Sequence, residues 1–224
     1  MNYLVNRIRQ CSVVVFMIAG ILGLMVNLYA ASSHVSSSAI ELSKLLNNIQ
    51  NLQADFTQVI YDNTGQILQR SSGNLALARP GKFYWSVKQP HTQLIIADGK
   101  KIWIYDPSLR QVIVQKMQDN FAGTPAFLLT APISDLVNSF KIISINCKSQ
   151  CSAFKLLPKQ QTDTLFQWVE LQFNNNTVTT MRLHDNLDQE TLISFQHEKL
   201  NQPLNAHIFN FTAPADVDVV QTSN

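Results

Sequence analysis

From Leu52 onward, apolar and polar residues alternate with a period of two, in short runs separated by turn signals. Asn63-Thr-Gly65, Asp98-Gly99 and Asn174-Asn-Asn176 are the clearest of these signals. Successive side chains of a strand point to opposite faces, and Gly, Asn and Asp favour tight turns, so the pattern predicts a sequential antiparallel sheet. The predicted strands are 53–61, 66–78, 82–88, 93–97, 101–106, 109–116, 141–146, 153–158, 165–173, 177–185, 190–200 and 207–211. About eleven strands predict an unclosed or wide barrel with room for a cavity.

The first thirty residues have the pattern of a cleavable secretory signal. Arg7 and Arg9 precede the 14-residue apolar run Val13–Val26, and small residues follow from Ala30 to Ser33. A retained membrane anchor is the alternative, but the run is short for a span of about 20 residues. We therefore predict a signal peptide over 1–30, with cleavage between 30 and 33, and a single domain over 31–224.

Charge excludes some classes of partner. Only 14% of the residues are charged, and removal of Arg7 and Arg9 leaves 15 basic residues against 15 acidic ones. A neutral chain does not offer the broad basic surface that nucleic acids or anionic membranes attract. No nucleic-acid partner is expected.

Cys147 and Cys151 are the cysteines that remain after the signal. In an exported chain the default for such a close pair is a structural disulfide. A metal site is not expected, because no histidine or second cysteine pair lies nearby, and a redox site would favour two intervening residues rather than three. Neither a metal nor a cofactor is predicted.

Helical patterns appear in two places. Ser38 and Glu41 have the spacing of a capping box, and the apolar stripe behind them consists of Leu42, Leu45, Leu46, Ile49 and Leu52. Further along, Thr124 and Pro125 predict a helix start, and Pro132 ends that helix before a second short one at Ile133–Val137. Two apolar helices broken by proline could cover the open face of a curled sheet.

The segment from Gly73 to Trp85 combines an apolar face with one strong donor. Arg79 ends one strand, Pro80 stops it, and Phe83 and Trp85 then share one face of the next strand. An apolar surface with a hydrogen-bond donor at its edge suits the holding of an apolar ligand rather than its chemical conversion. From spacing alone, however, the favoured interpretation of Arg79 is a surface arginine whose stem packs on its neighbours.

Five motifs together resemble the outer-membrane lipoprotein carrier (LolA) family across almost all of the chain after the signal. They are Phe56-Thr57-Gln58, Gly73-x-Leu75-x-Leu77-x-Arg79-Pro80-Gly81-x-Phe83-x-Trp85, Asp98-Gly99-Lys100-x-Ile102-Trp103-Ile104-Tyr105-Asp106, Thr124-Pro125-x-x-Leu128-Leu129 and Phe211-Thr212-x-Pro214-x-x-Val217-x-Val219. The resemblance implies a mainly β fold, an unclosed antiparallel barrel with a lid of three short helices over a hydrophobic cavity. It also implies a monomeric periplasmic chaperone that binds the acyl chains of lipoproteins.

In that family the cargo is received from an inner-membrane ABC transporter of the LolCDE type and passed to an outer-membrane receptor of the LolB type. The resemblance implies that Arg79 is a latch that bonds to the lid backbone in the closed state. The candidate cavity residues are Leu46, Ile49, Leu75, Leu77, Phe83, Trp85, Trp103, Phe127, Leu128, Leu129, Val169, Leu171, Ile193 and Phe195. For Trp103 the strand is apolar on both faces, so the side that lines the cavity is left open.

Other function classes are less well supported. The five histidines, His34, His91, His184, His197 and His207, form no catalytic or metal-ligand spacing, and no Gly-x-Ser-x-Gly elbow is present, so an enzyme is not expected. The alternative function is a periplasmic sensor of lipids or lipoproteins on the same barrel. The outer-membrane receptor would carry a lipid-modified cysteine after its signal, whereas Cys11 precedes the apolar run.

Overall fold

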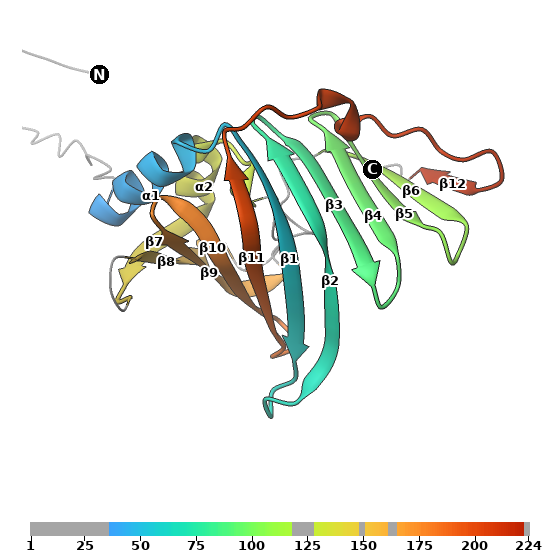
Figure 1. Ribbon diagram of the computed structural model, residues 1–224. Helices are drawn as coiled ribbons and strands as arrows, with labels where there is room; N and C mark the ends of the chain where they lie inside the picture. Colours follow the sequence, from blue (N-terminus) through green and yellow to red (C-terminus); the bar gives the residue numbers. More distant parts are fainter. Residues whose placement is uncertain (1–35, 118–127, 148–150, 161–164, 222–224) are drawn as a thin grey trace, which may run out of the picture. The chain divides into compact units, whose positions relative to one another are not determined.

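The computed structural model describes residues 36–117, 128–147, 151–160 and 165–221. Within this part, twelve strands form one sheet in the order β12-β6-β5-β4-β3-β2-β1-β11-β10-β9-β8-β7. The sheet curls strongly, so that it has a concave and a convex face (Figure 1). The predicted fold class, a mainly β unclosed barrel, is confirmed.

From β6 at one side of the sheet to β7 at the other, the eleven strands pair as antiparallel neighbours, and β1 pairs with both β2 and β11. Their bounds are β1 Asn51–Tyr61, β2 Ile67–Ala78, β3 Lys82–Gln89, β4 Gln93–Asp98, β5 Lys101–Asp106, β6 Gln111–Lys116, β7 Phe140–Ile145, β8 Cys151–Pro158, β9 Phe166–Asn174, β10 Thr177–Asp185 and β11 Glu190–Leu200. The sheet edges are β7 and β12, which are not paired to each other. The barrel is therefore open, as the family resemblance implied, and the sequential antiparallel order is the one that the alternation and the turn signals predicted.

The predicted last strand, 207–211, is wrong. Ala206–Phe209 form a 3-10 helix, η2, started by Asn205, whose side chain accepts a hydrogen bond from the His207 amide. The final strand is β12, Asp218–Gln221, which pairs with β6 in parallel. Local capping by Asn205 thus outweighs the short alternating pattern that suggested a strand.

Helix α1, Ser37–Asn47, opens the described domain, but its cap is not the predicted one. The N-cap is Ser36, whose Oγ accepts a hydrogen bond from the Ala39 amide. Ser38 instead accepts from the Ser144 amide, and Glu41 accepts from the Ser152 hydroxyl. The capping-box prediction is therefore wrong: both side chains tie α1 to the neighbouring strands β7 and β8.

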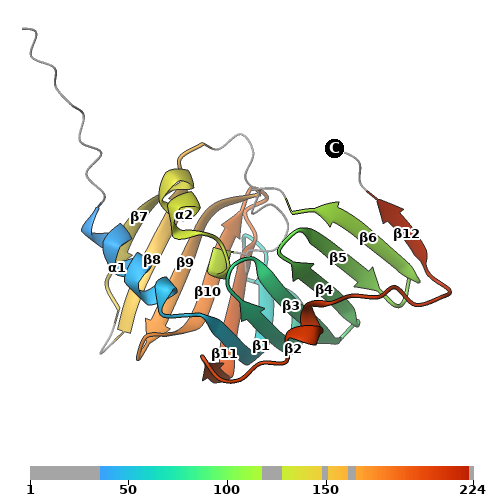
Figure 2. The same cartoon turned by 90° about the horizontal axis from the view of Figure 1, so that it is seen from above.

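The concave face carries the main core. Helix α2, Ile133–Ser139, and α1 lie near one end of the curled sheet, where they contact each other and β7 (Figures 1 and 2). We call α1 and residues 128–139 the lid. Leu42, Leu46, Leu129 and Leu136 of the lid are buried in one cluster with the sheet. The second predicted helix is confirmed as α2, whereas the helix predicted from Thr124 falls partly outside the described residues.

A second, smaller apolar layer covers the convex face of β3, β4 and β5. Phe209 of η2 is 2% exposed, and Ile96 is 3% exposed. Phe211 packs against Trp103 and Tyr105, with ring centroids 6.3 and 5.8 Å apart. The chain after β11 therefore acts as a cover for the back of the sheet.

Among the described residues, no helix is long and apolar enough to cross a membrane. The predicted signal peptide lies outside the described residues.

Candidate functional site

Most of the predicted cavity residues meet in one place, the space between the lid and the concave face. Those that belong to its buried cluster are Leu46, Ile49, Leu75, Leu77, Phe83, Trp85, Leu128, Leu129, Val169, Leu171, Ile193 and Phe195. They come from α1 and the residues just after it, from the lid turn, and from four strands, β2 and β3 on one side of β1 and β9 and β11 on the other. The described side chains of the lid therefore fill the space between the lid and the concave face.

Two predicted residues are not in this cluster. Phe127 lies outside the described residues. Trp103 lies on the convex side of β5 against Phe211, whereas its neighbours Ile102 and Ile104 pack against the concave core. On this strand the residues that face the cavity are therefore the two isoleucines.

An aromatic stack crosses the concave face where the motifs converge. Phe56 and Trp85 stack with their ring centroids 3.7 Å apart, although their strands are separated by β2. Gly73 lies opposite Phe56 on that middle strand, and a Cβ there would meet the Ser86 carbonyl oxygen at 1.8 Å. Glycine is required because backbone and ring both approach this position closely. Both rings belong to the buried cluster between the lid and the sheet.

Arg79 connects the end of β2 with the lid. Its Nη1 donates to the Ala131 carbonyl at 2.9 Å, and its Nη2 donates to the Leu129 carbonyl at 2.7 Å. These carbonyls belong to the turn that carries two of the buried lid leucines. The side chain of Arg79 therefore bonds to the lid through backbone carbonyls. Such acceptors are present whatever side chains the lid carries.

The electrostatics of this contact are unusual. Burial lowers the pKa of Arg79 to about 10, so the guanidinium stays charged at neutral pH. Both acceptors are neutral carbonyls, and Nε is buried without a hydrogen-bond partner among the described residues. A buried charge that lacks a counter-charge loses solvation free energy, which offsets part of the gain from the two bonds. The contact of Arg79 with residues 129 and 131 is accordingly weaker than that of an arginine paired with a carboxylate would be.

The two cysteines are bonded to each other, with a Cα–Cα distance of 5.7 Å, and they join β8 to the residues just after β7. The bond lies at the edge of the sheet, away from Arg79. Within the described segments, no group of three or more His, Cys, Asp and Glu residues is arranged to hold a metal ion.

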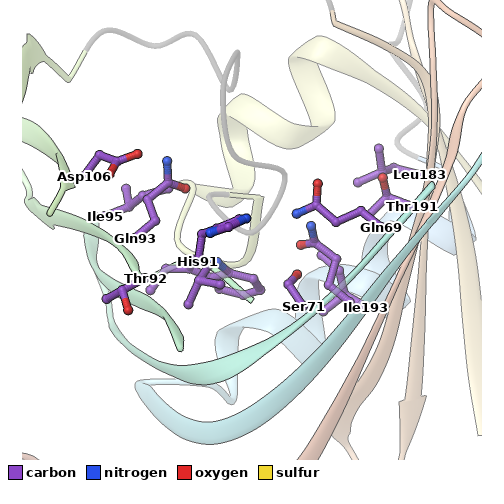
Figure 3. A pocket seen from close by; sticks show the side chains of 13 residues that line it. Gln69, Ser71, His91, Thr92, Gln93, Ile95, Asp106, Leu183, Thr191 and Ile193 are labelled. Carbon is purple, nitrogen blue, oxygen red and sulfur yellow. The ribbon is translucent and has the colours of Figure 1, made fainter. Parts of the chain in front are cut away.

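Sequence reasoning missed a second feature, a pocket of about 350 Å³ on the concave face beyond the Phe56–Trp85 stack. In Figure 3, Gln69 and Gln93 extend toward it from opposite sides, with His91 between them. Its floor is apolar and includes Trp85, Ile95 and Ile193, which also belong to the core cluster. The available signal was that Gln58, Gln69 and Gln93 share the concave face with buried apolar residues of their own strands.

The sequence has clear relatives. The family model "Outer membrane lipoprotein carrier protein LolA" matches residues 47–212. An outer-membrane lipoprotein carrier protein of Pseudomonas aeruginosa is 40% identical over 194 residues, which are 86% of this chain and 92% of the relative. One from Coxiella burnetii is 34% identical over 203 residues, 90% of this chain and 96% of the relative.

Among solved structures, a LolA-superfamily protein from Nitrosomonas europaea is similar with a TM-score of 0.48 at 12% identity. The match covers 79% of this chain and 99% of that one. The family model spans well over half of the chain and the curated relatives cover most of it, so this chain belongs to the outer-membrane lipoprotein carrier (LolA) family.

Proposed function

We propose that the protein is a periplasmic chaperone that carries lipoproteins by enclosing their acyl chains between the lid and the concave face. The single observation that carries the proposal is the lid-filled apolar cluster with Arg79 bonded to the lid backbone. The names of the curated relatives, outer-membrane lipoprotein carrier proteins, support the same cargo.

Physical chemistry sets what such a carrier must offer. An acyl chain of about 15 methylenes gains up to ~12 kcal/mol on leaving water, at roughly 0.8 kcal/mol each. A lipid-anchored protein therefore needs an apolar enclosure to cross an aqueous compartment. Leu128 and Leu129, both fully buried, fill this enclosure when no cargo is present. Cargo and lid compete for one surface, so the net affinity is a small difference between two burials, and release remains possible.

The partners and the compartment are part of this proposal. We infer that the carrier receives its cargo from an inner-membrane ABC transporter of the LolCDE type and delivers it to an outer-membrane receptor of the LolB type. We infer that its work is transfer without catalysis, because the side chains clustered between the lid and the sheet are apolar and the curated relatives are named as carriers. Residues 1–30 act as the signal peptide, and the protein works as a monomer.

Release of lipoprotein from a membrane tests the function. The purified protein is incubated with inner-membrane vesicles that contain a labelled lipoprotein and ATP, and the soluble fraction is separated by size. Soluble one-to-one complexes are expected. If no lipoprotein leaves the membrane while an established carrier releases it in parallel, the carrier function is wrong. The sensor function then becomes the better explanation, and it predicts that lipid binding changes the protein's affinity for a signalling partner.

Arg79 gives the mechanism its own test. In Arg79→Leu the empty closed state loses both hydrogen bonds, so cargo is bound about tenfold more tightly and is delivered poorly. Loading is expected to stay intact. Arg79→Lys is the matched control, because lysine keeps the charge but cannot donate to the Leu129 and Ala131 carbonyls as a planar fork. Its cargo affinity and its delivery should lie between those of the wild type and Arg79→Leu. Normal delivery by Arg79→Leu would contradict the latch while leaving the carrier function in place.

A further inference from the structure

Along the strands, the concave face changes from polar side chains at one end to buried apolar side chains at the other. On β2, the concave positions are Gln69 and Ser71 at one end but buried Leu75 and Leu77 at the end near Arg79. On β4, Gln93 precedes the buried pair Ile95 and Ala97 in the same way. The lid covers the apolar end, and the pocket of about 350 Å³ occupies the polar end.

The polar side chains of the pocket converge from separate strands. Gln58 comes from β1, Gln69 from β2 and Gln93 from β4, and Thr191 of β11 completes the rim. Within the described residues, none of these four side chains makes a hydrogen bond to another part of the protein. Each carboxamide offers both a donor and an acceptor at the edge of an apolar floor.

The charges of the pocket narrow the class of ligand. Among the described residues that line it, Asp106 is the one carboxylate, and that group is occupied by the β5–β6 turn, where its Oδ1 accepts from the Ser108 amide and hydroxyl. None of the described lining residues is a lysine or an arginine, so a phosphate or a carboxylate would find no strong cation among them. Neutral groups with alternating donors and acceptors fit best, and peptide amides are of this kind.

We propose that this pocket holds the polypeptide segment that directly follows the lipid-modified end of the cargo, through hydrogen bonds from Gln58, Gln69 and Gln93 to its main chain. The inference rests on the proposed function. Trp85 and Ile193 line both the pocket and the lid-covered cluster, so a ligand whose acyl chains displace the lid would leave its polar end at this rim. Recognition of main-chain amides would tolerate different cargo sequences.

Two lipid probes that differ only in peptide separate this subsite from the acyl cavity. One is diacylglyceryl-cysteine amide, and the other carries the same lipid followed by four alternating serine and glycine residues. The wild type is expected to bind the longer probe about tenfold more tightly, through hydrogen bonds from the three glutamines to the added main chain. In the variant Gln58→Leu/Gln69→Leu/Gln93→Leu this ratio should fall toward one.

The matched control is Gln53→Leu/Gln172→Leu/Gln196→Leu. It makes the same three glutamine-to-leucine changes on the convex face of β1, β9 and β11. It should keep the wild-type ratio, and binding of the short probe reports that each variant is folded. A ratio near one in the wild type, or an unchanged ratio in the pocket variant, would overturn the inference while the carrier function stands. If the wild type binds neither probe, the carrier function fails, and the inference with it.

Discussion

The same three strands, β3, β4 and β5, bury apolar side chains on both faces, but the two covers are attached differently. On the convex face, the chain after β11 is tied by backbone pairing, since β12 pairs with β6 and the Asp218 amide donates to the Arg110 carbonyl. On the concave face, residues 128–132 belong to no strand, and Arg79 bonds to this turn through its side chain. The convex cover ends in a strand of the sheet, whereas the concave cover is bonded to the sheet through the side chain of Arg79.

The difference teaches how a β protein can combine stability with an exchangeable core. Phe209 on the convex side and Leu129 on the concave side are equally well buried, at 2% and 0% exposed. Burial alone therefore does not distinguish a permanent core from a displaceable one. The distinction comes from what holds the backbone of the covering segment.

The largest effect is expected from a substitution at Gly73, where the backbones of β2 and β3 approach each other closely. In Gly73→Ala the new methyl group would meet the Ser86 carbonyl at 1.8 Å, so β2 and β3 cannot keep their register. We expect the free energy of unfolding to fall by more than ~3 kcal/mol, measured by urea titration. Gly65→Ala is the control, because no atom lies within 4 Å of its Cβ and only its φ of 82° is strained. Equal losses in the two variants would contradict this role of Gly73.

A matched pair of truncations then separates the two covers. Phe209→Ala and Leu129→Ala should each cost about 3 kcal/mol of unfolding free energy, since both leave a cavity in a packed cluster. Only Leu129→Ala should also raise the affinity for an acylated peptide, by about tenfold, because the empty lid loses part of its own burial. Affinity is measured by titration with a fluorescent lipopeptide. An equal gain in affinity for Phe209→Ala would remove the distinction between the covers.

The smallest effect on stability is expected from the contact between His197 and Asp55 on the convex face. His197 Nδ1 lies 2.8 Å from Asp55 Oδ2, and the hydrogen bond from His197 lowers the pKa of Asp55 below its usual value. A carboxyl whose folded pKa is lowered stabilises the fold above its unfolded pKa of about 4. That contribution is lost as the pH falls through the folded pKa.

His197→Asn tests this contribution, because asparagine tolerates the φ of 54° at this position but is too short for the contact. The urea midpoints of wild type and variant should differ slightly near pH 5 and converge once the pH falls below the lowered pKa of Asp55. A gap that stays constant with pH would show that Asp55 does not respond to His197.

Most of the fold could be predicted because the sheet is built from local patterns. The strand positions follow from the alternation of apolar and polar residues. The concave face follows from the set of alternate positions that includes Leu75, Phe83 and Leu171. The helix cap could not be fixed from sequence. Three consecutive serines, Ser36 to Ser38, are equally able to cap, and the docking of α1 on β7 selects the first of them.

The parts that sequence reasoning missed depend on long-range pairing. Parallel pairing of β12 with β6 joins residues about a hundred positions apart, and no local pattern encodes it. Trp103 lies on the convex face because Phe211 covers that side, which was not visible from a strand apolar on both faces. The glutamine pocket needed the register of three strands at once, since each glutamine alone looks like an ordinary surface residue.

Hydrogen exchange in the lid during cargo binding tests the central claim most directly. Amide exchange is followed at residues 128–139 and at Ala206–Phe209, with and without a saturating diacylated lipopeptide. The account predicts that cargo lowers protection in residues 128–139, where Leu129 and Leu136 leave the core, and leaves Ala206–Phe209 unchanged. Unchanged or increased protection of residues 128–139 in the loaded protein would contradict a lid that competes with the cargo for the cavity.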